Sequence, residues 1–98
     1  MEVTFKTKKL RRECTELKVT NRVYGNLMAE KIRQRIREIN GASTVEMLVE
    51  GSIGRCHPLK GERAGEYAMD LVHPYRLVFQ KVQDTVQIAQ ITSIEDYH

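Results

Sequence analysis

The chain has 98 residues, with 16 Lys and Arg against 13 Asp and Glu, so its formal net charge is +3. We expect a single domain over residues 1–98 with one modest core, because 41% hydrophobic content is too high for a disordered chain. No apolar run approaches the roughly 20 residues that span a bilayer, and the start lacks the apolar stretch of a signal peptide, so we expect a cytoplasmic protein with no membrane partner.

The first part of the chain predicts a strand followed by helices. Glu2–Phe5 is short and partly β-branched, which favours an edge strand. Thr7 is placed to cap a helix that runs to Leu17 with one apolar stripe. From residue 21 to residue 39, apolar side chains recur every three or four positions, which predicts the longest helix. The pair Asn40 and Gly41 predicts a left-handed stop for that helix.

Four basic residues are expected on the outer face of this longest helix, namely Lys31, Arg33, Arg35 and Arg37. Residues 1–49 hold 11 basic and 6 acidic residues, a net charge of +5, whereas residues 50–98 hold 5 basic and 7 acidic, a net charge of −2. A basic helix face suits the phosphate backbone of RNA, but ordinary solvated helices often carry as much charge. Both interpretations stay open at this point.

After residue 43 the pattern changes from helix to strand. Ser43 and Glu46 have capping-box spacing, which predicts a short helix over residues 44–49 that Gly51 ends. Four strands follow, with turns at 61–65, 73–74 and 83–84, and they are predicted over residues 55–59, 66–72, 75–81 and 85–94. Connections this short favour an antiparallel meander. We therefore predict an α+β fold whose N-terminal helices pack on one face of a small, mainly antiparallel sheet of four to five strands.

Polar side chains gather at the predicted strand ends and turns, and their chemistry suits cleavage of an RNA backbone without a metal. That reaction needs a base for the 2′-hydroxyl, a cation over the phosphate and an acid for the 5′-leaving oxygen. In this hypothesis His57 and His98 exchange the base and acid roles, and Tyr97 stacks on a nucleobase or donates its hydroxyl. The predicted catalytic residues are His57, Lys60, Arg76, Asp96, Tyr97 and His98. Arg63 and His73, in neighbouring turns, join the helix cations as predicted RNA contacts.

Each of these residues also has a structural interpretation. Arg76 pairs with Asp70 or Glu66 across the hairpin in that interpretation, and Lys60 solvates a turn. A histidine or tyrosine at a strand end is often a half-buried structural residue. The pattern of single residues alone therefore does not decide between the two.

A zinc site is a further alternative, since Cys56, His57, Asp96 and His98 are all competent ligands. Adjacent residues on a strand point to opposite faces, so Cys56 and His57 seldom ligate one ion. The two cysteines are too few for a disulfide scaffold, and a reducing compartment would keep them as thiols. The sequence has no metal, nucleotide or nucleophile motif, so no cofactor is predicted.

Four segments together carry a resemblance to a known family. They are HPLKGER at residues 57–63, EY at 66–67, YRLVF at 75–79 and IEDYH at 94–98. In this order they resemble the HigB-like branch of the RelE/ParE toxins, the "plasmid maintenance killer" proteins of bacterial type II toxin–antitoxin pairs. The two-helix pattern before the sheet agrees with it, so the resemblance covers nearly the whole chain.

The resemblance implies a ribosome-dependent mRNA endonuclease that cuts the codon in the ribosomal A site and is silenced by a cognate antitoxin of helix-turn-helix type. It makes His57 the general base or acid, Lys60 a phosphate contact and Arg76 the cation of the transition state. It assigns the terminal DYH to the catalytic end. Branches that poison DNA gyrase lack this histidine-rich ending, which favours RNA. The alternative is a non-catalytic relative that binds an antitoxin or inhibits gyrase.

The sequence departs from the family pattern in two places. Tyr67 stands where the family often has tryptophan, and the run of residues 87–93 before the terminal DYH is several residues longer than usual. If the last strand simply extends, the terminal residues keep their place relative to His57. If it bulges, they move.

Overall fold

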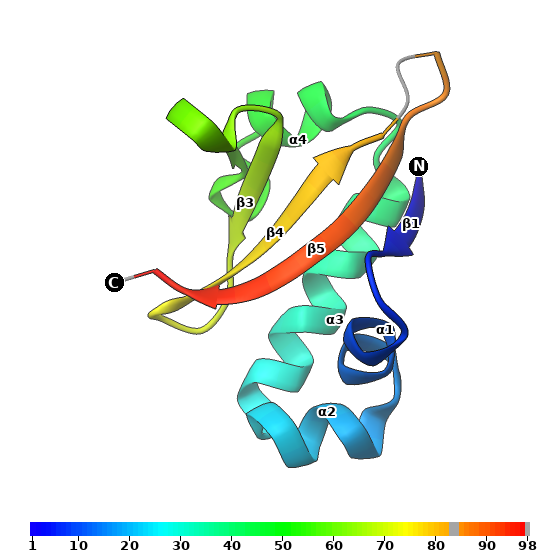
Figure 1. Ribbon diagram of the computed structural model, residues 1–98, viewed down its shortest axis with the longest axis vertical. Helices are drawn as coiled ribbons and strands as arrows, with labels where there is room; N and C mark the ends of the chain where they lie inside the picture. Colours follow the sequence, from blue (N-terminus) through cyan, green and yellow to red (C-terminus); the bar gives the residue numbers. More distant parts are fainter. Residues whose placement is uncertain (83–84, 98) are drawn as a thin grey trace.

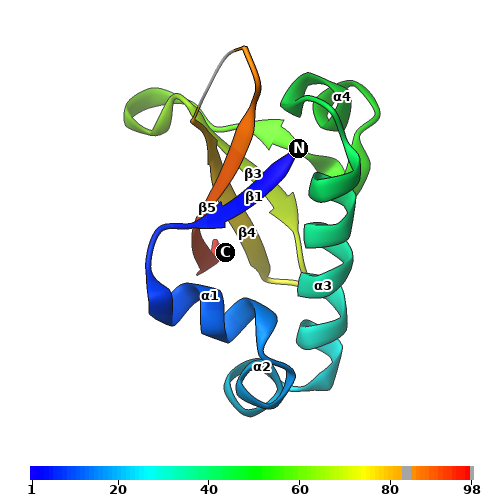
Figure 2. The same cartoon turned by 90° about the vertical axis from the view of Figure 1, so that its right-hand side faces the viewer.

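A sheet and a layer of helices make up residues 1–82 and 85–97, the part of the chain that the computed structural model describes (Figures 1 and 2). The strands are β1 (Glu2–Phe5), β2 (His57–Pro58), β3 (Glu66–Asp70), β4 (Tyr75–Lys81) and β5 (Ile88–Asp96). The helices are α1 (Lys8–Thr15), α2 (Leu17–Tyr24), α3 (Asn26–Gly41) and α4 (Val45–Glu50), with two 3₁₀ turns, η1 (Ile53–Arg55) and η2 (Gly61–Arg63). None of the helices in this described part is long and apolar enough to cross a membrane.

The five strands form one sheet in the order β1-β5-β4-β3-β2. Strands β2 to β5 pair antiparallel, as the short connections predicted, and β1 pairs parallel with β5. The strand at the start of the chain thus lies at one edge of the sheet and β2 lies at the other. The predicted α+β fold with a mainly antiparallel sheet is confirmed.

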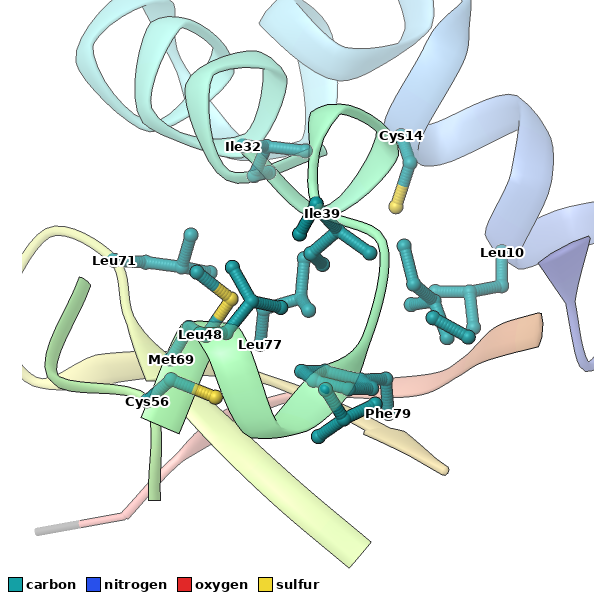
Figure 3. Close-up of a cluster of buried hydrophobic side chains, with 14 of the residues drawn as sticks. Leu10, Cys14, Ile32, Ile39, Leu48, Cys56, Met69, Leu71, Leu77 and Phe79 are labelled. Atoms are coloured by element: carbon teal, nitrogen blue, oxygen red, sulfur yellow. The ribbon is translucent and has the colours of Figure 1, made fainter. Parts of the chain in front are cut away.

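One face of the sheet is covered by α1, α3 and α4 (Figure 2), and the hydrophobic core lies between these layers. Alternation along β4 points Leu77 and Phe79 toward the helices, where both side chains are fully buried. Figure 3 shows Ile32 and Ile39 of α3 facing them. Burying an apolar side chain of this size contributes about 1.5–3 kcal/mol, so this layer is the main source of stability.

Within the described residues no α-helix covers the opposite face of the sheet, which is called the open face below (Figure 2). It is formed by the side chains that alternate with the core residues: His57 on β2, Ala68 on β3, Arg76 and Val78 on β4, and Glu95 on β5. Ala68 and Val78 are buried on this face, so polar side chains cover them rather than water.

The longest predicted helix is wrong in one respect, because it is two helices with a sharp turn at Gly25. Apolar spacing from Tyr24 to Met28 and Ile32 continues through the turn, which is why the sequence pattern did not show it. Gly25 has φ +82° and ψ 169°, a backbone conformation that residues other than glycine rarely adopt. The chain therefore turns between α2 and α3 instead of continuing as one helix.

Several smaller boundaries also differ from the predictions. The cap of α4 is Thr44, whose hydroxyl accepts from the Met47 N–H, and not Ser43. Gly41 does not take a left-handed conformation, because α3 ends on an extended Ala42. The predicted strand over 55–59 shrinks to His57–Pro58, since η1 occupies the residues before it. The predicted turn at Gln83 and Asp84 lies outside the described residues.

A β-bulge interrupts the pairing of β4 with β5. Val78 is opposite Ser93 and Phe79 is opposite Ile91, so Thr92 is an extra residue between them. Its hydroxyl donates to the Val78 carbonyl at 3.2 Å. One extra residue restores the inward direction of Ile94 after the inward-pointing Ile91, because side chains on a strand alternate. The long run before the terminal motif therefore contains a bulge.

Candidate functional site

His57 lies on the open face at the edge of the sheet, opposite Ala68 of β3. Its Nδ1 is 2.7 Å from the backbone carbonyl oxygen of Arg55. A carbonyl oxygen only accepts hydrogen bonds, so Nδ1 is the nitrogen that carries the proton. In the neutral ring, Nε2 then has the lone pair. The imidazole is thus oriented with its basic nitrogen away from the backbone, as a general base requires.

The carbonyl that orients His57 belongs to a residue in an uncommon conformation. Arg55 has φ +55° and follows Gly54, which has φ +57°. A left-handed conformation costs a residue with a side chain about 1–2 kcal/mol, so the surrounding contacts must hold it. Arg55 Nε donates to the Asp70 carboxylate at 2.6 Å. The hydrogen bond with Asp70 is the largest cause of the raised pKa of Arg55, followed by the charge of Asp70.

Arg35 of α3 packs against the η1 turn. It is not on the outer face of its helix, which corrects the sequence prediction. It is only 9% exposed. Its Nε donates to the Asp70 carbonyl at 2.7 Å, and its Nη1 pairs with Glu38 at 2.9 Å. The guanidinium packs so closely on Gly54 that a Cβ there would lie 2.7 Å from Arg35 Nε. Arg35 is therefore a structural residue that ties α3 to η1 and β3.

Arg76 is held on the open face by Glu95 of the neighbouring strand. Its Nε and Nη2 donate to Glu95 Oε1 at 3.3 and 3.2 Å. Glu95 also accepts from Arg63, through Nη1 at 2.9 Å and Nη2 at 2.6 Å. The Ser93 hydroxyl donates to Glu95 Oε2 at 2.8 Å. The expected partners of Arg76 in the structural interpretation, Asp70 and Glu66, are thus replaced by Glu95.

This pairing determines the charge state of the open face. The pKa of Glu95 is lowered from 4.5 to about 2, chiefly by the hydrogen bonds from Arg63, against an opposing effect of burial and with help from Ser93 and Arg76. Arg63 also donates to Glu66 of β3 at 3.0 and 3.1 Å. Because Glu66 lies on β3 and Glu95 on β5, the Arg63 guanidinium crosses over β4 between them. Two arginines and two glutamates therefore form one network across the open face.

Tyr97 follows β5 and lies against Arg76, with the arginine Cζ 5.0 Å from the ring centroid. This is the geometry of a cation–π contact. The Tyr97 ring also meets His73 edge-on, with centroids 6.5 Å apart. Figure 1 shows the end of the chain beside the turn between β3 and β4, and the Tyr97 N–H donates to the Pro74 carbonyl there. The structure thus brings Tyr97, Arg76 and His73 together.

Asp96 is not on the open face. It is opposite Tyr75, one position beyond the pair of Arg76 with Glu95, and successive side chains on a strand point to opposite sides. Asp96 therefore lies on the side of the sheet that the helices cover, away from His57 and Arg76. The bulge at Thr92 causes this placement, because an unbulged strand would turn Asp96 outward and Glu95 inward.

The remaining predicted residues are spread over the molecule. Lys60 is exposed just before η2, in the loop that also carries Arg63. His98 lies outside the described residues. Arg33 and Arg37 line a hollow with Cys14 and Thr15 on the helix side of the molecule. Lys31 is on the same helix, where its Nζ donates to Gln34 at 3.2 Å.

The zinc alternative finds no support in the described residues. No group of three or more His, Cys, Asp or Glu side chains lies close enough to hold a metal ion within residues 1–82 and 85–97. Cys56 is 3% exposed and joins the core, whereas His57 is on the open face, so the two point apart as predicted. Burial raises the pKa of the Cys56 thiol to about 11, which keeps it protonated at neutral pH.

Four residues were missed from the sequence as parts of the site: Glu66 and Glu95 of the open-face network, and the separate pair of Arg55 with Asp70. One signal for Glu95 was present. Ala89 and Ile91 are two positions apart, but Ile91 and Ile94 are three apart, and such a step in an otherwise alternating strand indicates a bulge. The placement of Arg55 carries no such signal, because its left-handed backbone depends on the close packing of Arg35 beneath the turn.

No protein-family model matches the sequence, and no curated protein matches it either. Solved structures do match over the whole chain. A YoeB/ParE toxin from Agrobacterium tumefaciens has a TM-score of 0.68 at 18% identity, and both chains are covered completely. A YoeB–YefM complex from Staphylococcus aureus matches with a TM-score of 0.65 at 24% identity, and a YoeB dimer from the same organism with 0.60 at 25%; each match covers this whole chain and 97% of the other.

The chain therefore has the fold of the RelE/ParE toxin superfamily, as the sequence resemblance predicted. The similar structures are YoeB toxins, so the HigB-like branch stays a prediction.

Proposed function

We propose that this protein is the toxin of a type II toxin–antitoxin pair and that it cuts mRNA on the ribosome by general acid–base catalysis without a metal. The main support is the open face, which carries an oriented histidine, a partly buried arginine on the central strand and a tyrosine on one surface of a toxin-like fold. His57, Arg76 and Tyr97 lie there on β2, on β4 and after β5. The similar solved structures are toxins, which supports the same class for this chain.

The proposed reaction uses the RNA as its own nucleophile. His57 Nε2 removes the proton of the 2′-hydroxyl, and the 2′-oxygen attacks the adjacent phosphorus. The bond from phosphorus to the 5′-oxygen breaks, and an acid from the chain end protonates that oxygen. Tyr97 and His98 are the candidates for this acid. The products are a 2′,3′-cyclic phosphate and a free 5′-hydroxyl.

Arg76 is assigned to the phosphate, where negative charge builds in the transition state. Its guanidinium offers a planar fork of donors that matches phosphate oxygens, and Tyr97 restricts it by stacking. Standard strand spacing puts β2 and β4 about 10 Å apart. His57 is opposite the small Ala68, which is opposite Val78, and Arg76 lies two residues from Val78 along β4. A sugar–phosphate unit laid diagonally over Ala68 and Val78 would contact both His57 and Arg76.

The purified protein added to translating ribosomes tests this reaction. We expect cut mRNA whose fragments carry cyclic phosphate and 5′-hydroxyl ends, and little cutting of free RNA. Arg76→Ala should lower the rate about 100- to 1,000-fold, as loss of one transition-state donor typically does. Arg11→Ala, an arginine on α1 away from the open face, is the matched control and should cut normally. Fragments with 3′-hydroxyl ends, or full activity in Arg76→Ala, would contradict the mechanism.

A cognate antitoxin is the proposed protein partner, acting with the toxin in the bacterial cytoplasm. One of the similar structures is a YoeB–YefM complex, which supports a partner of this kind. The groove between α1 and α2 offers a surface of suitable chemistry, with four basic side chains around two valines; it is lined by Lys8, Lys9, Arg12, Glu13, Val19, Arg22 and Val23. An acidic amphipathic segment fits that surface. Co-expression with the neighbouring reading frame tests it, and Val23→Glu should weaken co-purification.

Two observations favour the non-catalytic alternative, in which the chain only binds an antitoxin or gyrase. Arg76 already has an anionic partner, and Asp96 is on the other face of the sheet. Growth arrest with intact mRNA would support that alternative over cleavage.

A further inference from the structure

Glu95 lies on the open face between the side chains of two arginines. Its two carboxylate oxygens accept from Arg63 and Arg76, and Ser93 supplies a third donor. A carboxylate and a phosphate present oxygens of similar spacing to arginine forks, so donors arranged around one also suit the other. The set is partly buried: the side chains of Arg76 and Glu95 are 17% and 24% exposed.

We propose that Arg63 and Arg76 form a two-arginine phosphate site for RNA and that Glu95 is its built-in competitor, which an incoming phosphate must displace. The proposal rests on the proposed function, because it assumes that RNA is the ligand of the open face. In the unbound protein, Glu95 satisfies both guanidinium groups and lowers their attraction for RNA. Binding therefore requires a phosphate that is positioned well enough to exchange with the carboxylate.

The backbone explains why Glu95 and not its neighbour has this role. The bulge at Thr92 sets the direction of the strand end, so that Glu95 faces Arg76 and Asp96 faces the helices. Glu66 holds Arg63 from the other side, at 3.0 and 3.1 Å. Arg63 thus remains over β4 when Glu95 leaves, already in place for the phosphate.

The competition also has a consequence for selectivity. Free RNA is flexible and pays conformational entropy to place a phosphate between two arginines, whereas an RNA held by the ribosome is already ordered. The need to displace Glu95 weakens the binding of both kinds of RNA. The ordered RNA still binds, because it pays less conformational entropy. Glu95 would therefore suppress binding of free RNA.

Removal of the competing charge is the test. The probe is a fluorescein-labelled 2′-O-methyl RNA oligonucleotide, which cannot be cut because its 2′-oxygen is blocked, and affinity is measured by anisotropy. Glu95→Gln keeps the size of the side chain and loses its charge. We expect binding about 10-fold tighter than wild type, and a salt dependence steeper by about 0.7 in log–log slope, as one more neutralised phosphate on a single strand gives.

Glu62→Gln is the matched control. Glu62 is exposed in η2 beside Arg63, and this variant also removes one negative charge. We expect it to leave the salt slope unchanged. Equal affinities and slopes for the two variants would overturn the proposal. If Glu95→Gln does not fold by circular dichroism, Glu95→Ala decides instead, because it removes the same competing charge; we again expect tighter binding than wild type, and no gain would overturn the proposal.

The result is separable from that of the proposed function. If Glu95→Gln binds RNA more tightly but the wild-type protein never cuts mRNA, the role of Glu95 as a competitor is supported and the nuclease function is refuted. Cleavage on ribosomes, together with equal binding by Glu95→Gln and Glu62→Gln, would refute only the competitor.

Discussion

Among single residues, Glu95 has the largest influence on the open face, because it joins Arg63 from η2 to Arg76 on β4. The sequence placed Arg63 and Arg76 among the functional residues but gave Arg76 the wrong carboxylate partner. Strand register decides that partner, and register beyond a bulge is not visible in a list of candidate cations and anions. The opposite directions of Cys56 and His57, in contrast, were predictable from strand alternation alone.

The lowered pKa of Glu95 predicts a specific loss of stability in acid. Its carboxylate is charged above the ordinary value of 4.5 in the unfolded chain and stays charged in the folded protein down to about 2. The network therefore stabilises the fold fully above pH 4.5, and this contribution disappears as the pH falls toward 2. We expect the melting temperature of Glu95→Gln to fall less than that of wild type over this range.

The comparison is made by thermal unfolding at several pH values, and Glu62→Gln should follow the wild-type profile. A wild-type slope in Glu95→Gln would show that the network does not account for the acid sensitivity.

At the scale of elements, the bulge in β5 does most to shape the site. The alternation rule predicted the strand correctly but not the faces of its last residues, because one extra residue reverses every later side chain. The three-position step between Ile91 and Ile94 was the available signal. The core requires both isoleucines inside, so Thr92 is the residue left over.

Deletion of Thr92 should therefore be tolerated. The shortened strand keeps Ile91 and Ile94 in the core and Glu95 opposite Arg76, so we expect a change in unfolding free energy within about 1 kcal/mol. Deletion of Gln90 is the matched control. It turns Ile91 outward and a threonine inward, which should cost about 2–5 kcal/mol.

Urea denaturation measures both variants. Equal destabilisation by the two deletions would mean that Thr92 is part of a regular pairing and not a bulge residue.

The turn at Gly25 is the second element-scale feature that periodicity could not show. Helix signals depend on the spacing of apolar side chains, and here that spacing continues across the turn. Only the glycine itself marks the break. Sequence reasoning was successful for the strands, whose alternation and short turns constrained both their number and their antiparallel order.

Gly25→Ala should destabilise the protein by about 1–3 kcal/mol, the usual cost of a side chain in a conformation restricted to glycine. No atom lies within 4 Å of the added Cβ, so the cost is backbone strain alone. Gly41→Ala is the control, because Gly41 ends α3 in open space. We expect it to be neutral or to stabilise by up to about 1 kcal/mol. Denaturant unfolding distinguishes the two, and equal effects would contradict the strained turn.

For the molecule as a whole, the charge of the sequence divides between two sides. The half with a net charge of +5 forms β1 and the helices, and the half with a net charge of −2 forms most of the sheet. The proposed chemistry lies in the net-acidic half, on the face that the helices leave open (Figure 2). The basic helices are then available for ribosomal RNA or for the antitoxin while the open face meets the mRNA.

The most direct test of this account is a map of mRNA ends in cells after brief expression of the protein, with 5′-hydroxyl ends captured and placed on the reading frames. We predict new 5′-hydroxyl ends within translated codons for the wild type, recurring with the three-nucleotide period of the frame. His57→Ala, expressed to the same level and folded, should give none. New ends that persist in His57→Ala, or growth arrest by the wild type with no new ends, would contradict cleavage at the open face.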